Sequence, residues 1–187
     1  PEHPFHLKEA VSIRAMTARE EDILTSRALL KDGSMISRLI ESCVVDKGLD
    51  AATLLSGDRN ALVTAIRITG YGAEYRSTIA CPVCSSPNKH TTNLTDLPVR
   101  RLELDPTGIG HNEFNTTLPV TGKNVTFRFT NGYDEREMTL MSERRAKQGM
   151  LIEPVVTDRL FRAITSIEGN TDKSFIRKFV TNMPAGD

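Results

Sequence analysis

Residues Tyr75 to Leu97 read Tyr-Arg-Ser-Thr-Ile-Ala-Cys-Pro-Val-Cys-Ser-Ser-Pro-Asn-Lys-His-Thr-Thr-Asn-Leu-Thr-Asp-Leu. Side chains alternate in a strand-like pattern over residues 75–80, a Cys-Pro-Val-Cys turn follows, and a second strand is expected over residues 90–97. The sequence therefore predicts a zinc-ribbon-like β-hairpin. This hairpin is expected to divide a helical front of the chain from a mixed rear.

The turn carries a pair of cysteines at the spacing that zinc ribbons use. Two residues between Cys81 and Cys84 allow both sulfurs to bind one ion. A structural tetrahedral site needs four ligands, and the further candidates are only His90, His111 and Cys43. His90 is the best third ligand because it lies on the returning segment. Zinc at the pair is one interpretation, and a zinc-free turn with the shape of a ribbon is the other, which the incomplete ligand set favours.

Other patterns that carry chemistry are missing from the sequence. A redox-active Cys-x-x-Cys begins a helix, whereas this pair is expected between strands. We find no glycine-rich phosphate loop and no Gly-x-Ser-x-Gly elbow, and the four histidines are scattered. The sequence therefore predicts no enzyme activity, no catalytic residue and no cofactor apart from zinc at the cysteine pair.

The composition limits the class of partner. Lysine and arginine number 24, as do aspartate and glutamate, so the net charge of zero gives no general attraction to nucleic acid. No apolar run approaches the roughly 18 to 20 residues of a membrane-spanning helix. Three clustered cysteines do not form a secreted disulfide framework, which places the protein in a reducing cytosol or in an assembly built there.

The front of the chain divides into an extended arm, residues 1–16, and a helical region, residues 17–72. A capping box with glutamate at its fourth position starts the helical region at Thr17. Apolar spacing predicts an amphipathic helix over residues 35–45 with Cys43 on its buried face, and another helix over residues 59–69 with Asp58 as its N-cap.

The arm is the best candidate for a segment that binds a partner, because it has apolar residues and no obvious helix of its own to pack against. The candidate residues are Phe5, Leu7, Val11 and Ile13. The equal alternative is that the arm forms a strand that completes its own domain. The sequence does not separate these two interpretations.

The rear of the chain divides into a β-rich region, residues 73–130, and a C-terminal helical region, residues 131–187. A second hairpin is expected over residues 115–130, with Val125, Phe127 and Phe129 on one face. Helical spacing predicts helices after Asp134, over residues 155–167 and after Thr171, and we expect the chain to continue beyond residue 187. The predicted class is α+β.

The order of the motifs resembles a known family. The segments that carry the resemblance are Met16-Thr-Ala-Arg-Glu-Glu-Asp-Ile-Leu-Thr25, the Cys-Pro-Val-Cys hairpin, Leu118-Pro119 with Gly122-Lys123, the strand with Phe127 and Phe129, Ile164 to Gly169, and Met183 to Asp187. Together they resemble the T4-type phage baseplate hub protein family, whose members are also described as hub assembly proteins of contractile-tailed phages. The front segment is the most specific.

The resemblance implies a non-enzymatic structural or assembly role in the hub or inner baseplate of a contractile tail. It implies other tail and baseplate subunits as partners in a symmetric assembly, a location in the virion tail, and assembly in the host cytoplasm. Two hypotheses compete with it. One is a zinc-ribbon adaptor that binds nucleic acid or a transcription complex, which the zero net charge opposes. The other is an enzyme that uses the Cys81 and Cys84 thiols.

Overall fold

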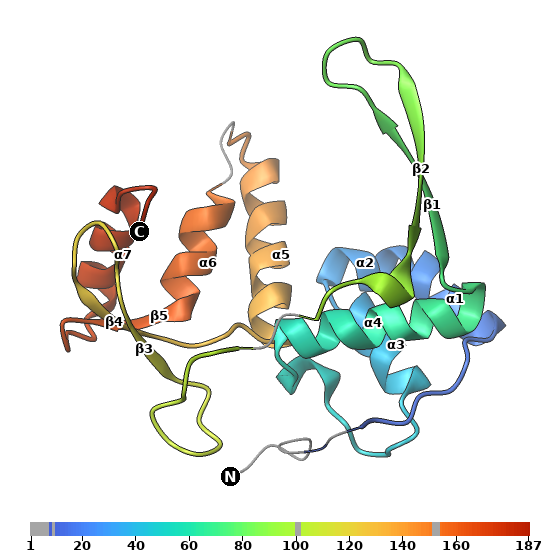
Figure 1. Cartoon of the computed structure of the whole chain (residues 1–187), viewed down its shortest axis with the longest axis horizontal. Helices are drawn as coiled ribbons and strands as arrows, with labels where there is room; N and C mark the ends of the chain where they lie inside the picture. Colours follow the sequence, from blue (N-terminus) through green and yellow to red (C-terminus); the bar gives the residue numbers. More distant parts are fainter. Residues whose placement is uncertain (1–7, 9, 100–101, 151–153) are drawn as a thin grey trace.

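The computed structural model describes residues 8, 10–99, 102–150 and 154–187, and within these residues the chain has a mixed α+β fold (Figure 1). This confirms the predicted class. The helices are α1 (Ala18–Thr25), α2 (Arg27–Asp32), α3 (Met35–Cys43), α4 (Ser56–Tyr71), α5 (Gly132–Lys147), α6 (Val155–Ala163) and α7 (Lys173–Asn182), with short 3-10 turns η1 (Ala51–Thr53) and η2 (Leu94–Asp96).

Five strands in the described part of the chain form two separate antiparallel sheets. The first sheet is a hairpin of β1 (Glu74–Ala80) and β2 (Pro87–Asn93), and it projects away from the rest of the molecule (Figure 1). The second sheet has the order β3 (Phe114–Thr117), β4 (Asn124–Phe127) and β5 (Ile164–Ile167). Both predicted hairpins are confirmed, but the second strand of the first one is shifted from the expected residues 90–97: it begins at Pro87 and ends at Asn93, where η2 follows.

One predicted helix is wrong in its second half. The helix expected over residues 155–167 ends at Ala163, and residues 164–167 form β5 against β4. Ile164 and Ile167 are both buried in this strand. Their spacing of three residues also fits a helix, so the pattern alone did not distinguish the two structures. The pairing with β4, which includes a register shift, provides the partner that favours the extended form.

The helical front forms one compact unit, which we call the N-terminal lobe (residues 10–72). Helix α3 is amphipathic as predicted, and Cys43 is fully buried on its inner face. Helix α4 starts at Ser56, three residues before the predicted start, so Asp58 lies in its first turn and is not its N-cap. The buried core of this lobe consists of Leu39, Ile40, Cys43, Val44, Ala51, Leu54 and Ile66.

The arm completes this lobe from the outside. Ile13 and Val44 form an isolated antiparallel bridge, and the amide of Val45 donates to the carbonyl of Ser12 over 2.9 Å. Val11 and Ile13 are half-buried and pack against the core of the lobe. Within the described residues, the arm therefore acts as an extended segment of its own domain.

The rear of the chain builds a second core between the three-stranded sheet and helices α6 and α7, which we call the C-terminal lobe (residues 113–130 and 154–187). Its buried residues are Leu118, Val125, Ile164, Ile167, Ile176 and Val180. Three aromatic rings of the sheet, those of Phe114, Phe127 and Phe129, lie with centroids 5.2 to 5.8 Å apart. These contacts are the expected offset and edge geometries of aromatic packing.

Helix α5 joins the two lobes (Figure 1). At its start, the amide of Gly132 donates to the carbonyl of Leu54, and a Cβ on Gly132 would lie 2.8 Å from Cα of Ala52. Arg59, which is 2% exposed, reaches across to Glu135 over 3.1 Å and donates to the carbonyl of Ala51 over 2.6 Å. The junction is therefore close-packed and ionic, and it requires glycine at position 132.

Candidate functional site

The projecting hairpin is the most exposed ordered element of the chain. Its strands pair without a break from Glu74 opposite Asn93 to Ala80 opposite Pro87. Nearly every side chain on both faces is exposed, including Ile79 at 58% and Val83 at 92%. An isolated two-stranded sheet is only marginally stable in water. The hairpin therefore depends on its attachment to the N-terminal lobe, and its apolar side chains at Ile79 and Val83 face solvent.

The tip of the hairpin is a tight turn that presents the two thiols. The amide of Ser85 donates to the carbonyl of Cys81 over 2.8 Å, and the amide of Cys81 donates to the carbonyl of Ser86 over 2.9 Å. Ser85 adopts a left-handed backbone with φ of 57°. That conformation is uncommon outside glycine, asparagine and aspartate, and here it turns the chain back directly after the second cysteine.

The two thiols at the tip differ from the third in their surroundings. Cys84 is exposed, Cys81 is half-buried, and all three cysteines are free. The Ser86 hydroxyl oxygen lies 3.0 Å from the Cys84 sulfur, and hydrogen bonds from this hydroxyl, the Ser86 amide and the Cys81 thiol lower the pKa of Cys84. Burial raises the pKa of the Cys43 thiol. The tip thus favours thiolate, the form that binds metals, whereas Cys43 is protected within the core.

The structure does not bring the other predicted ligands to the tip. His90 lies opposite Ser77, three positions along the strand from Pro87, which is roughly 10 Å at ~3.3 Å per residue. His111 packs beside Gly108 in the segment between the two sheets. Among the described residues, no three side chains of histidine, cysteine, aspartate or glutamate gather in a metal-binding group. Zinc at Cys81 and Cys84 stays a prediction.

The base of the hairpin is anchored to the N-terminal lobe by cation–π contacts. The guanidinium of Arg67 lies 4.9 Å from the ring centroid of Tyr71 and 5.9 Å from that of Tyr75. Arg67 also donates to the carbonyl of Gly72 over 3.0 Å, and the Tyr71 hydroxyl contacts the carboxylate of Glu21. These contacts fix the direction in which the hairpin leaves helix α4.

A second exposed surface follows the hairpin, in the segment between β2 and β3, which we call the connector (residues 94–113). After η2, no helix or strand is assigned to the described residues of this segment, and long loops inside a domain are usually functional. Its exposed apolar side chains, up to 88% accessible, are Leu97, Val99, Leu102, Leu104 and Ile109. The connector is therefore a second segment with exposed apolar side chains, which follows the base of the hairpin in the chain.

The residues predicted for partner binding in the arm fall into two groups. Val11 and Ile13 pack against the N-terminal lobe, which gives them a role inside the chain. Phe5 and Leu7 lie outside the described residues. Partner binding by the arm stays a prediction. Sequence reasoning did not identify the exposed apolar residues of the hairpin tip and the connector as candidates for binding.

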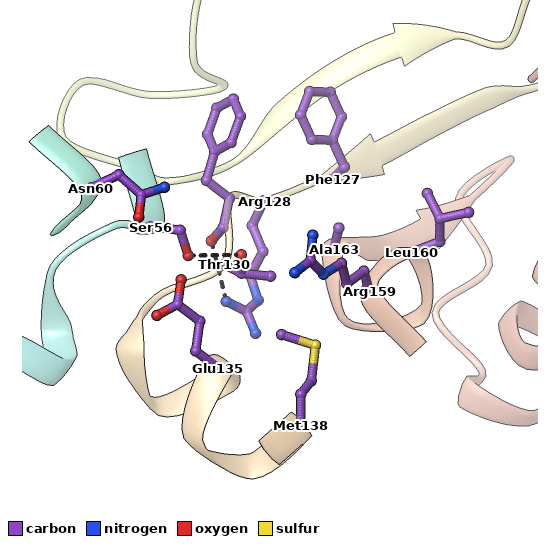
Figure 2. Close-up of a pocket in the computed structure, with 11 residues that line it drawn as sticks. Ser56, Asn60, Phe127, Arg128, Thr130, Glu135, Met138, Arg159, Leu160 and Ala163 are labelled. Atoms are coloured by element: carbon purple, nitrogen blue, oxygen red, sulfur yellow. Dashed lines mark hydrogen bonds between the residues drawn. The ribbon is translucent and has the colours of Figure 1, made fainter. Parts of the chain in front are cut away.

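A cleft of about 320 Å³ lies where the two lobes meet (Figure 2). Ser56 and Asn60 of α4, the segment after β4, and residues of α5 and α6 line it. The hydroxyls of Ser56 and Thr130 are 3.1 Å apart, and the amide of Ser56 donates to the carbonyl of Thr130 over 2.9 Å. The cleft thus lies beside the contact between α4 and the segment that leads into α5, and it is open to solvent.

The charged groups around this cleft are largely paired with each other. Arg128 makes two 2.7 Å hydrogen bonds to the carboxylate of Asp134, and Glu135 accepts from Arg59. The exposed side chain of Arg159 enters from α6 (Figure 2). None of the residues that line this cleft is a histidine, cysteine or aspartate. The arrangement stabilises the junction and presents no nucleophile beside a base.

A buried carboxylate holds the arm against the N-terminal lobe, and the sequence showed only its role at a helix start. Glu20 accepts the amide of Thr17 over 2.8 Å, as predicted, but it is also fully buried and receives two bonds from Arg14 and one from Ser42. Arg14 above all, with the Ser42 and Thr17 hydroxyls, lowers the pKa of Glu20 against the opposing effect of burial. This network joins the arm, α1 and α3.

A helical lobe with a projecting hairpin and an exposed connector defines a protein suited to contacts with other chains. The comparison with known families identifies the class of protein. The family described as T4 bacteriophage base plate protein matches residues 1–112, more than half of the chain, and the protein belongs to this family. Its class is therefore a structural component of a phage baseplate, which places it in the tail of a virion with other tail subunits as partners.

The matched residues cover the arm, the N-terminal lobe, the hairpin and nearly all of the connector, and they end just before β3. No curated protein and no solved structure matches the chain. Of the helices in the described part of the chain, none combines the length and hydropathy that crossing a membrane requires.

Proposed function

We propose that this protein is a non-enzymatic component of the hub or inner part of a contractile-tail baseplate, or a factor that assembles it in the host cytoplasm. The order of the sequence motifs supports the hub as the location. Its partners are other tail and baseplate subunits within a symmetric assembly, and its binding surface is the hairpin with the connector.

The observation that carries this proposal is the coincidence of the family match with the exposed apolar surface. The hairpin and all but the last residue of the connector lie within residues 1–112, and both segments expose apolar side chains that neither core uses. An unpartnered two-stranded sheet also offers free backbone edges, to which a neighbouring chain can add a strand. A baseplate subunit needs such a surface.

Peptide mass spectrometry of purified intact tails, beside unfinished assembly intermediates, tests the proposal. A fixed amount of the chain in finished tails would make it a structural subunit. Its presence only in intermediates would make it an assembly factor that leaves. Its absence from both would contradict the proposal.

A hairpin deletion tests the binding surface. Replacing residues 75–92 with two glycines removes no residue of either core, so both lobes should still fold. We expect the deleted protein to retain its circular dichroism and cooperative unfolding, yet to be lost from tails and intermediates alike. Normal incorporation of the folded deletion protein would show that the hairpin is not the assembly surface.

A further inference from the structure

We propose that the hairpin tip is half of a zinc site, and that a second copy of the chain completes it. Cys81 and Cys84 of each copy would supply two thiolates, so two tips would hold one zinc ion between four sulfurs. This inference concerns the tip alone and does not depend on where the protein sits in a phage tail.

The ligand count leads to this arrangement. The tip presents two free thiols on one tight turn, and cysteine sulfur is a ligand that zinc prefers. The described residues supply no third ligand at the tip, because His90 lies roughly three positions along the strand from Pro87. A structural zinc site needs four ligands in a tetrahedron. The missing two must come from outside the described part of this chain.

A second copy supplies the missing ligands in the simplest way. Two identical turns related by a two-fold axis place two pairs of sulfurs around one ion, which is an isologous contact. The hairpin holds the tip away from both lobes, so two tips can approach without contact between the bodies (Figure 1). Each copy gives the same half of the tetrahedron.

The side chains around the thiols suit a contact between two identical surfaces. Residues 77–88 contain no charged side chain, so two tips meet without repulsion between like charges. Val83, exposed at 92% between the two cysteines, and Ile79 on the adjoining strand would be covered by the second tip. Lys89, the first charge on the returning strand, would lie near the negative charge of a zinc ion bound by four thiolates.

The experiment uses the full chain, purified with zinc and a non-thiol reductant so that disulfide links do not form. Elemental analysis counts the zinc, and light scattering after size exclusion gives the mass before and after a chelator is added. We expect about one zinc per two chains and a dimer that halves in mass on chelation. Cys84→Ser should lose the zinc and the dimer while the circular dichroism spectrum stays unchanged.

Two control variants separate the alternatives. Cys43→Ala keeps both thiols of the tip and should retain zinc and dimer. His90→Ala should also retain both, because a second copy supplies the remaining ligands. One zinc bound per monomer, loss of zinc in the folded His90→Ala protein, a dimer that survives chelation, or a folded wild-type chain without zinc would each overturn the proposal. None of these results would alter whether the chain is found in tails.

Discussion

The two β-hairpins of this molecule have the same topology and opposite surroundings. The first pairs seven residues on each strand, and almost all of its side chains face solvent. The second pairs only four, yet a third strand and helices α6 and α7 cover it, and Val125 is buried at its centre. The longer hairpin therefore adds no residue to a hydrophobic core, whereas the shorter hairpin is part of the core of the C-terminal lobe.

The difference separates stability from function. Buried apolar area dominates folding free energy, whereas backbone hydrogen bonds add little net stability because water competes for them. The second hairpin is thus a structural part of the C-terminal lobe. The first contributes no residue to either core, so its apolar side chains are available for the contact with another chain that we propose. Substitutions in the two hairpins test this division directly, and substitutions elsewhere test the contacts that hold the two lobes.

Replacing a buried isoleucine of the second sheet should be far more costly than the same change in the first. Ile167 is fully buried in β5, so Ile167→Ala should lower the free energy of unfolding by about 3 to 4 kcal/mol. Ile79→Ala is the matched control and should change it by less than about 0.5 kcal/mol. Urea unfolding measures both. Equal losses would mean that the hairpin has a core that this structure does not show.

The buried carboxylate of the N-terminal lobe should matter nearly as much. Glu20→Gln replaces an acceptor of bonds from Arg14, Ser42 and Thr17 with an amide, and it leaves Arg14 without its counter-charge. We expect Glu20→Gln to lower the free energy of unfolding by about 3 kcal/mol at pH 7. The control Asp22→Asn, at an exposed neighbouring carboxylate, should lower it by less than about 0.5 kcal/mol.

The pH dependence of this effect has a defined sign. Because the folded protein lowers the pKa of Glu20, its ionised form adds stability above the unfolded pKa of about 4.3, and this stability is lost as the pH falls towards the folded value. The gap between wild type and Glu20→Gln should therefore narrow progressively below about pH 4.3. A gap that stays constant down to pH 3 would rule out the charged network as its cause.

The junction between the lobes should respond to a single methyl group. In Gly132→Ala, the new Cβ would lie 2.8 Å from Cα of Ala52 and also overlap the guanidinium of Arg59. We expect this substitution to lower the free energy of unfolding by about 2 kcal/mol, which thermal unfolding measures. Gly57→Ala, in the first turn of α4, meets nothing within 4 Å and should be neutral or slightly stabilising. If both variants behave alike, the lobes are not packed as closely as the structure shows.

Periodicity and turn chemistry predicted most of the elements, and tertiary pairing decided the rest. The helix over residues 35–45 and both hairpins came from local patterns that packing did not override. Residues 164–167 were assigned to a helix because Ile164 and Ile167 fit its spacing. Only the partner strand β4, far away in the sequence, made them a strand. A local pattern holds no information about such a partner.

The same limit explains the missed parts of the site. Arg59 and Glu20 were placed at helix starts, and nothing in their neighbours in sequence showed that they would be buried and paired with Glu135 and Arg14. The cysteine pair was found because its spacing is local. The exposure of Val83 was not predicted, because the sequence does not show which residues surround a valine in the fold. Long-range contacts and exposed surface are the two properties that need the fold.

The smallest expected effect on stability is at the hairpin tip, where it should coincide with a large effect on association. Val83→Ser changes a side chain that is 92% exposed, so the free energy of unfolding should move by less than about 0.5 kcal/mol. If a second tip covers this valine, the dimer should dissociate roughly a hundredfold more readily, since both copies lose a covered valine and burying each one contributes ~1.5 kcal/mol. Zinc should still bind because the thiols remain. Sedimentation at several concentrations measures the dissociation constant. An unchanged dimer would show that the tip meets its partner through the metal alone, and a destabilised monomer would show that the first hairpin resembles the second after all.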